Sequence, residues 1–294
     1  MKEEIKVFVA SNKFIYLLLF PILKLRKAYL SFIERRFIMR FDKTISNIME
    51  GSVVVNLKNI PGKYEIDARS HLLHRILISK VYEPAIVELI IKYTPPNKDA
   101  INIGANVGLF TNLIAIQISD NCRVLAIEPT PHAYGFLKRN IARNGNESKI
   151  ILYNGIAIDK PGDYKMNVIQ GKEEYSSIGK IVIPFREPQI YSTIDIKGDT
   201  IDNLVVKYNL IPGIIVIDVE GAEYAVLKGS VNTIKKYKPV IISEIVDLYL
   251  FEQESSSKLI IKLLDELGYR ILNVENSEFN FPFTGNLIAI PNIE

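Results

Sequence analysis

The sequence INIGANVGLFT over residues 101–111, followed by VLAIEP over residues 124–129, decides the fold of this chain. A short apolar run ends in a glycine turn, a helical pattern follows, and a second apolar run ends in a carboxylate. Gly104 and Gly108 let the backbone approach a ligand closely, because glycine has no Cβ. Glu128 follows Gly108 by 20 residues, at the end of the next predicted strand, where a carboxylate can accept hydrogen bonds from both hydroxyls of a ribose. The pattern predicts a nucleoside-binding crevice in a doubly wound α/β sheet.

Length and composition are those of a globular protein with a sizeable core. The chain has 294 residues, of which 48% are hydrophobic, so it is long enough for one large domain or two small ones. Its net charge of +3 is concentrated near the N-terminus and does not by itself indicate nucleic-acid binding. The single cysteine, Cys122, excludes an internal disulfide and fits a reducing compartment, so we expect a cytoplasmic protein.

Residues 1–50 are predicted to form an apolar and basic helical segment ahead of the main domain. The run FIYLLLFPIL at 14–23 has ten residues, whereas a helix that spans a bilayer needs about 20. Basic residues follow at 24–27, where a cleavable signal peptide would have small ones. Two interpretations remain. Residues 5–40 contact the inner face of a membrane peripherally, with their apolar side in the lipid, or this segment packs on its own domain or on a partner subunit.

Apolar runs alternate with helical patterns within a single domain predicted over residues 51–294. Repeated βα units imply a parallel sheet with right-handed crossovers and helices on both faces, so we expect a doubly wound, mostly parallel, Rossmann-like fold. A strand-rich insertion interrupts the alternation at about 159–198, and an antiparallel hairpin closes the chain. The predicted strands are 100–104, 123–128, 149–154, 213–218, 239–245, 269–274 and 286–290. The predicted helices are 108–118, 131–144, 200–208, 222–236 and 256–267, and shorter elements precede them at 52–57, 64–66 and 83–92.

Polar residues collect directly after the predicted strands, whose bodies are apolar. Ligands of such sheets bind at the carboxyl ends of the strands, so these residues form the candidate site. The candidates for cofactor binding are Asn102, Gly104, Ala105, Asn106, Gly108, Glu128 and Asn154. The loop lacks the G-x-G-x-x-G spacing of dinucleotide oxidoreductases and the P-loop pattern. Its G-x-x-x-G spacing is typical of Rossmann-like methyltransferases that use S-adenosylmethionine (SAM).

Several segments together resemble the FkbM family of SAM-dependent methyltransferases. They are residues 101–108, Glu128-Pro129, residues 200–202, residues 217–229 and residues 239–244. The similarity covers about residues 80–270, and the sequence DVEGAE at 218–223 is its most distinctive part. The resemblance implies SAM as cofactor and, in most members, O-methylation of sugars, glycans or secondary metabolites. The family usually has Asp where this chain has Asn102, and often Lys where it has Val216.

Acidic residues near the ends of two later strands are the catalytic candidates. They are Asp218, Glu220 and Glu244. Because SAM already carries a reactive sulfonium, the protein must align a hydroxyl and remove its proton. Neighbouring carboxylates raise one another's pKa, which makes a better base near neutral pH. Alternatively, Asp218 and Glu244 bind Mg²⁺, as acids at these positions do in catechol-type O-methyltransferases, although the amide residue beside the second acid is Ile245 here.

Structural roles compete with functional ones at some of these positions. Glu220 and Glu223 can instead cap the helix predicted at 222–236 and interact with its dipole. Asn154 either contacts adenine or turns the chain. The side-chain carbonyl of Asn102 can still accept a hydrogen bond from the SAM ammonium, at a cost of roughly 1 kcal/mol relative to a carboxylate.

The predicted acceptor is a hydroxylated small molecule or a glycan, and three alternatives compete with this hypothesis. A nucleic-acid methyltransferase is disfavoured, because DVEG at 218–221 stands where amino-methylating DNA enzymes have Asn/Asp-Pro-Pro-Tyr/Phe, and carboxylates repel a phosphate backbone. A nicotinamide oxidoreductase is disfavoured by the loop spacing. A non-catalytic binding protein with the same fold stays open, because Asn102 and Val216 depart from the family pattern.

Overall fold

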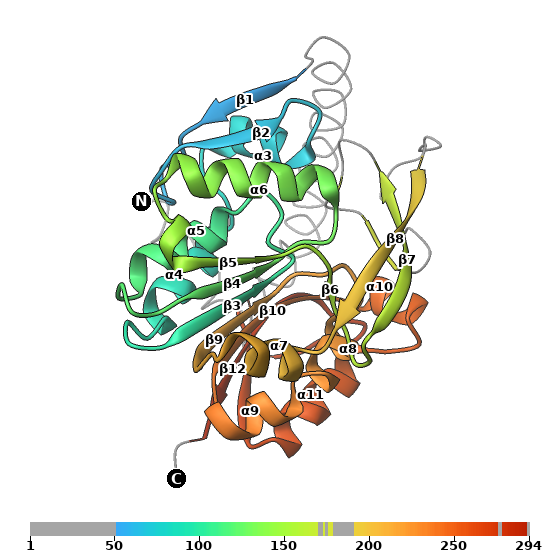
Figure 1. The fold of residues 1–294 in the computed structure, drawn as a ribbon. Helices are drawn as coiled ribbons and strands as arrows, with labels where there is room; N and C mark the ends of the chain where they lie inside the picture. Colours follow the sequence, from blue (N-terminus) through green and yellow to red (C-terminus); the bar gives the residue numbers. More distant parts are fainter. Residues whose placement is uncertain (1–50, 170–172, 174–175, 179–190, 276–277, 293–294) are drawn as a thin grey trace, which may run out of the picture. The chain divides into compact units, whose positions relative to one another are not determined.

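The structure is a computed structural model and describes residues 51–169, 173, 176–178, 191–275 and 278–292. These residues belong to one compact unit, and the segment predicted at 1–50 lies outside them. The unit is a layered α/β fold with helices on both sides of a central sheet (Figure 1). Among the described residues, no helix is long and apolar enough to cross a membrane.

Seven strands form the central sheet in the order β11-β12-β10-β9-β3-β4-β5. The strands from β10 to β5 pair in parallel, whereas β12 pairs antiparallel with both β10 and β11. The predicted fold class is therefore confirmed, including the antiparallel hairpin at the edge. The order of the strands reverses between β3 and β9, which is where such sheets bind their ligands. The bounds are β3 Asp99–Ile103, β4 Val124–Ile127, β5 Ile150–Tyr153, β9 Pro212–Ile217, β10 Val240–Val246, β11 Tyr269–Asn273 and β12 Thr284–Pro291.

The two central strands are apolar because helices cover both of their faces. Every residue of β3 and β9 is buried. On one face, Ile101 and Ile103 pack in a core that includes Leu204. On the other face of the sheet, Ala126 of the neighbouring strand β4 packs with Leu137. This double burial explains the continuous apolar runs of the sequence. The helices are α4 Pro84–Tyr93, α5 Leu109–Gln117, α6 Pro131–Arg143, α7 Ile201–Tyr208, α8 Glu223–Lys228, α9 Val231–Tyr237 and α11 Ser257–Glu266.

The single helix predicted at 222–236 is wrong, because the chain forms two helices there, α8 and α9. The break lies at Gly229, where an added Cβ would come within 2.2 Å of the carbonyl oxygen of Ile158. The backbone at Ile158, directly before the insertion, thus approaches so closely that only glycine fits. The contact joins residues distant in the chain, so a helical periodicity cannot reveal it.

The predicted insertion contains a second, three-stranded sheet in the order β6-β8-β7. Its strands are β6 Ile156–Ala157, β7 Gly162–Ile169 and β8 Tyr191–Asp199, and β7 pairs antiparallel with β8. The strand predicted at 180–185 lies outside the described residues. Before the central sheet, β1 Ser52–Val55 and β2 Tyr64–Asp67 form an antiparallel pair close to the predicted positions. Two short helices were not predicted, α3 His71–Ser79 and α10 Asp247–Glu252.

Candidate active site

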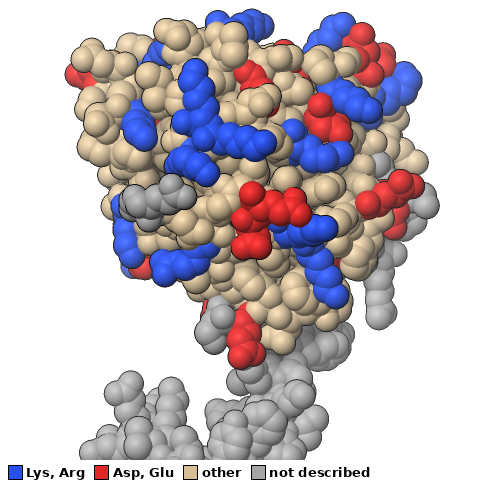
Figure 2. Space-filling view, turned by 90° about the horizontal axis from the view of Figure 1, so that it is seen from below, with Lys and Arg blue, Asp and Glu red and all other residues tan. Residues whose placement is uncertain are grey.

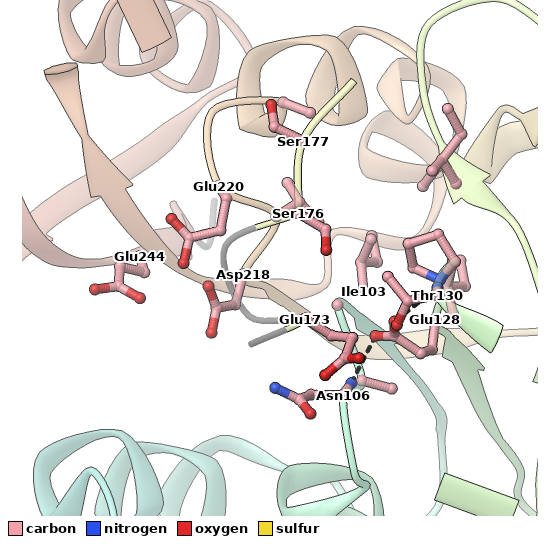
Figure 3. Close-up of a pocket in the computed structure, with 18 of the residues that line it drawn as sticks. Ile103, Asn106, Glu128, Thr130, Glu173, Ser176, Ser177, Asp218, Glu220 and Glu244 are labelled. Atoms are coloured by element: carbon pink, nitrogen blue, oxygen red, sulfur yellow. Dashed lines mark hydrogen bonds between the residues drawn. The ribbon is translucent and has the colours of Figure 1, made fainter. Parts of the chain in front are cut away.

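A cavity of about 380 Å³ lies at the carboxyl ends of the central strands. Its wall comes from the loops after β3, β4 and β9, from β10, and from α3 and α10. Figure 3 shows Glu128 and Thr130 at one end of it and Asp218 and Glu244 at the other. Among the described residues that line it, the Asp, Glu, Lys and Arg side chains are five carboxylates and one guanidinium. These are Arg75, Glu128, Glu173, Asp218, Glu220 and Glu244.

The Glu128 carboxylate is held firmly at its end of the cavity. Its Oε2 accepts the backbone N–H of Asn106 at 2.8 Å, and its Oε1 accepts the backbone N–H and hydroxyl of Thr130 at 2.9 and 2.6 Å. A carboxylate offers about four acceptor positions, so these bonds leave about one for a ligand hydroxyl. Burial raises the pKa of Glu128 from its ordinary value. The prediction that Glu128 faces a ligand site therefore agrees with its position, with room for one further hydrogen bond rather than two.

The two glycines of the predicted loop have positive φ angles and close neighbours within the protein. Gly104 has a φ of +80°, and an added Cβ would come within 1.7 Å of the carbonyl oxygen of Asp218. Gly108 has a φ of +91°, and an added Cβ would come within 2.7 Å of Leu137. The backbone conformation and contacts within the protein thus require glycine at both positions, and the approach of a ligand to them stays a prediction. Gly104 still lines the cavity with Ala105 and Asn106.

Asn102 and Asn154, two of the predicted cofactor-binding residues, are not among the residues that line the cavity. Asn102 is 1% exposed, and its Nδ2 donates to Thr111 Oγ1 at 2.8 Å. Among the described residues, its buried Oδ1 has no hydrogen-bond partner. Asn154 is exposed, and its Nδ2 donates to the carbonyl oxygens of Glu128 and Pro129 at 2.9 and 3.0 Å. Its contacts fit the structural alternative, in which Asn154 supports the loop after β4.

Asp218 and Glu244 lie on neighbouring strands and repel each other. Asp218 follows β9 directly, and Glu244 lies within β10, two residues before its end. Burial, together with the negative charges of Glu83 and Glu223, raises the pKa of Asp218. Repulsion by Asp218, together with burial, raises the pKa of Glu244. The pair therefore holds protons up to a higher pH than ordinary carboxyl groups, as a general base near neutral pH requires.

The other two acids of the DVEGAE segment have different surroundings. Glu220 lines the cavity and has a φ of +50°, which is uncommon outside glycine. Glu223 is 2% exposed and is not among the lining residues, and its Oε1 accepts the backbone N–H of Gly221 at 3.0 Å. Burial raises the pKa of Glu223 to about 7. Glu223 thus supports the turn before α8, but the predicted cap is absent, because no side-chain hydrogen bond caps α8 at Ala222.

The predicted metal site has two candidate ligands, Asp218 and Glu244. Among the described residues, no group of three or more His, Cys, Asp or Glu side chains is arranged to hold a metal ion. Asp218 and Glu244 are the predicted ligands, and Mg²⁺ binding by them stays a prediction.

A third group of lining residues, not predicted from the sequence, comes from the chain before the central sheet and from Phe110. Arg75 on α3 forms an ion pair with Glu83, and its guanidinium lies 5.3 Å from the centre of the Tyr82 ring. Tyr82 in turn packs on Phe110, with ring centroids 5.5 Å apart. Arg75, Tyr82 and Phe110 all line the cavity. The Ser70 cap and the apolar spacing of α3 are the sequence signals from which this helix could have been predicted.

Comparison with known proteins supports the resemblance seen in the sequence. The model of the methyltransferase FkbM domain matches residues 102–271. A search of curated proteins found no match.

Solved structures similar to this chain include methyltransferases of distant sequence. The crystal structure of methyltransferase FkbM from Methylobacillus flagellatus KT is 16% identical, with a TM-score of 0.44 over 85% of this chain. This chain spans 58% of the length of that protein. An O-methyltransferase from Bacillus cereus, solved with SAH, is 14% identical, with a TM-score of 0.40 over 71% of this chain and 80% of its own. On the strength of the family match, which covers more than half of its residues, this chain belongs to the FkbM methyltransferase family.

Proposed function

We propose that this protein transfers a methyl group from SAM to a hydroxyl group of a saccharide, a glycolipid or a related small molecule. One observation carries the proposal. A single cavity joins Glu128, after β4, to the acidic pair of Asp218, directly after β9, and Glu244, within β10. Membership of the FkbM family favours SAM as the methyl donor and a hydroxyl group as the acceptor. The choice of a glycan rests on analogy with the family.

The residues around Glu128 suit the adenosine part of SAM. Glu128 has one acceptor position left for a ribose hydroxyl, as its hydrogen bonds indicate. Next to it the lining is apolar at Ile127, Ile156 and Ala157, which suits the faces of a purine ring. The cavity volume also falls within the range of pockets that enclose ligands of this size.

The acidic pair supplies the base. SAM brings a methyl group on a positively charged sulfur, so the protein does not need to activate the methyl carbon. An ionised carboxylate of Asp218 or Glu244 accepts the proton of the acceptor hydroxyl and later releases it to water. Because the pKa values of both groups are raised, the ionised form is lost at a higher pH than for an ordinary carboxyl group. We therefore expect turnover to fall as the pH drops below neutrality.

Calorimetry tests the cofactor. SAM and S-adenosylhomocysteine should both bind, and NAD should not. Glu128→Gln should weaken SAM binding by about 10-fold, because an amide offers fewer acceptor positions than a carboxylate. Binding of NAD with no heat from SAM or S-adenosylhomocysteine would contradict the proposal and favour an oxidoreductase.

Methyl transfer tests the reaction and the base. Labelled SAM is supplied with a fractionated extract of the source cells, and the labelled product is isolated. Asp218→Asn should lower turnover by at least 100-fold with little change in SAM affinity, because it removes the proton acceptor. Asp265→Asn, on the exposed face of α11, is the matched control and should leave turnover unchanged. Unchanged turnover in Asp218→Asn would show that the base assignment is wrong.

Chelation separates a base from a metal site. If Asp218 and Glu244 act without a metal, EDTA leaves turnover unchanged. Loss of turnover with EDTA, restored by Mg²⁺, would instead support the metal-binding interpretation of the same two residues.

A further inference from the structure

A buried hydroxyl in the wall of the cavity lacks a hydrogen-bond partner. Ser176 lines the cavity, and the residue is 5% exposed. Among the described residues, its Oγ has no hydrogen-bond partner. A buried hydroxyl without a partner is costly, because it has given up its hydrogen bonds to water and gained none in return. An unpartnered hydroxyl in the wall of a ligand cavity therefore points to a partner that the ligand supplies.

Backbone hydrogen bonds hold Ser176 in place on both sides. The backbone N–H of Ser176 donates to the carbonyl oxygen of Glu173 at 3.0 Å. The next residue, Ser177, forms an antiparallel bridge with Asn167 of β7, with N···O distances of 3.0 and 2.9 Å. The hydroxyl is therefore carried by backbone that is fixed to the second sheet, and Figure 3 shows it directed into the cavity.

The neighbours of Ser176 belong to the half of the cavity proposed for adenosine. On one side in the chain, Ile178 packs against the apolar cluster that contains Ile156, and both residues line the cavity. On the other side, Glu173 lines the cavity within range of Glu128, because burial and then the negative charge of Glu173 raise the pKa of Glu128. Ser176 thus stands beside both the carboxylate proposed for the ribose and the apolar wall proposed for the purine.

Asn154, which the sequence offered for adenine, is engaged elsewhere. Its Nδ2 donates to the carbonyl oxygens of Glu128 and Pro129, and Asn154 is not among the lining residues. A serine hydroxyl donates one hydrogen bond and accepts two. Ser176 can therefore meet a ring nitrogen or the amino group of adenine, or a hydroxyl of the ribose.

We propose that the Ser176 hydroxyl binds the adenosine part of SAM, so that the insertion, and not only the central sheet, contributes a residue to the cofactor site. The inference rests on the proposed function, because it concerns the cofactor of that reaction. The hydrogen bond forms only in the loaded protein. The free protein therefore carries the cost of the unpartnered hydroxyl, and binding of the cofactor relieves it.

Calorimetry with two ligands locates the contact. S-adenosylhomocysteine and 5′-methylthioadenosine share the adenosine part, and only the first carries the amino-acid part. Ser176→Ala should weaken the binding of both by a similar factor, about fivefold, as expected for one neutral hydrogen bond. Ser192→Ala, at an exposed position of β8, is the matched control and should leave both affinities unchanged.

Two results of this experiment would overturn the proposal. Weaker binding of S-adenosylhomocysteine without an equal loss for 5′-methylthioadenosine would place the hydroxyl on the amino-acid part. No binding of 5′-methylthioadenosine by the wild type would show that the adenosine part contributes too little for such a contact.

The stability of the free protein gives an independent readout. Ser176→Ala removes a hydroxyl that has no partner in the free protein, so the midpoint of urea unfolding without ligand should stay the same or rise. A serine with a purely structural role would behave in the opposite way, because its loss would lower the midpoint and weaken ligand binding through damage to the fold. A lower midpoint for Ser176→Ala would therefore overturn the proposal.

Failure of the proposed function gives a different result. If the wild type binds neither SAM nor S-adenosylhomocysteine, the proposed function is wrong. If the wild type binds S-adenosylhomocysteine and Ser176→Ala binds it equally well, only the assignment to Ser176 is wrong. An unchanged affinity for S-adenosylhomocysteine together with a raised KM for the acceptor would move the hydroxyl to the acceptor half of the cavity.

Discussion

At the scale of single residues, the Glu223 carboxyl group is the most completely buried acid of the DVEGAE segment. Its Oε1 has a hydrogen bond from Gly221, but its Oε2 has no hydrogen-bond partner among the described residues. Burial raises the pKa of Glu223 to about 7. An acid whose pKa is higher in the folded than in the unfolded protein binds more protons when folded. Its contribution to stability is therefore present at low pH and is lost as the pH rises from about 4.5 to about 7.

Replacement of Glu223 by glutamine should remove this loss. The side chain of Gln has the size of Glu and stays neutral. The difference in the free energy of unfolding between Glu223→Gln and the wild type should therefore increase, in favour of the variant, from pH 5 to pH 8. The expected gain is on the order of 3 kcal/mol, at about 1.4 kcal/mol for each pKa unit. Urea unfolding at both pH values measures it, and Glu147→Gln, which is exposed, serves as the control. A difference that does not vary with pH would mean that Glu223 is ionised in the folded protein at both values.

At the scale of elements, close approach of strands fixes the glycine loop. Gly104 and Gly145 both have a positive φ, +80° and +69°, so alanine costs about 1 kcal/mol at either site from the backbone alone. A Cβ at Gly104 would also collide with the carbonyl oxygen of Asp218, whereas nothing lies within 4 Å of one at Gly145. We expect Gly104→Ala to lower the free energy of unfolding by roughly 3 kcal/mol or more and Gly145→Ala by about 1 kcal/mol. Equal losses in urea unfolding would show that β3 and β9 separate easily.

Elements buried on both faces could be predicted from the sequence, and elements fixed by distant contacts could not. The runs that became β3 and β9 are apolar throughout because helices cover them on both sides. The acids at the strand ends stand out against these runs. The division of the predicted helix at Gly229 depends on Ile158, which lies far away in the chain. The position of Arg75 in the cavity likewise depends on how α3 packs, which no local pattern encodes.

At the scale of the whole molecule, basic and acidic residues are unevenly distributed along the chain. The first 50 residues hold ten Lys and Arg against five Asp and Glu, so the other 244 residues hold 26 against 28. A basic stretch beside the apolar run at 14–23 is typical of segments that lie on anionic membranes. We propose that residues 5–40 make such a contact.

Vesicle binding by the full chain tests this contact. Each basic residue near an anionic surface contributes about 1 kcal/mol, so replacing Lys24, Arg26 and Lys27 together by glutamine should weaken binding to phosphatidylserine vesicles by at least tenfold. The matched control replaces Lys207, Lys235 and Lys236, which are exposed in the described domain. Figure 2 shows one face of the described residues, on which basic and acidic side chains are interspersed, so this control should bind as the wild type does. Equal weakening in both variants would show that vesicle binding depends on the net charge of the protein and not on residues 5–40. If the wild type does not bind the vesicles, the segment instead packs on the domain or on a partner subunit.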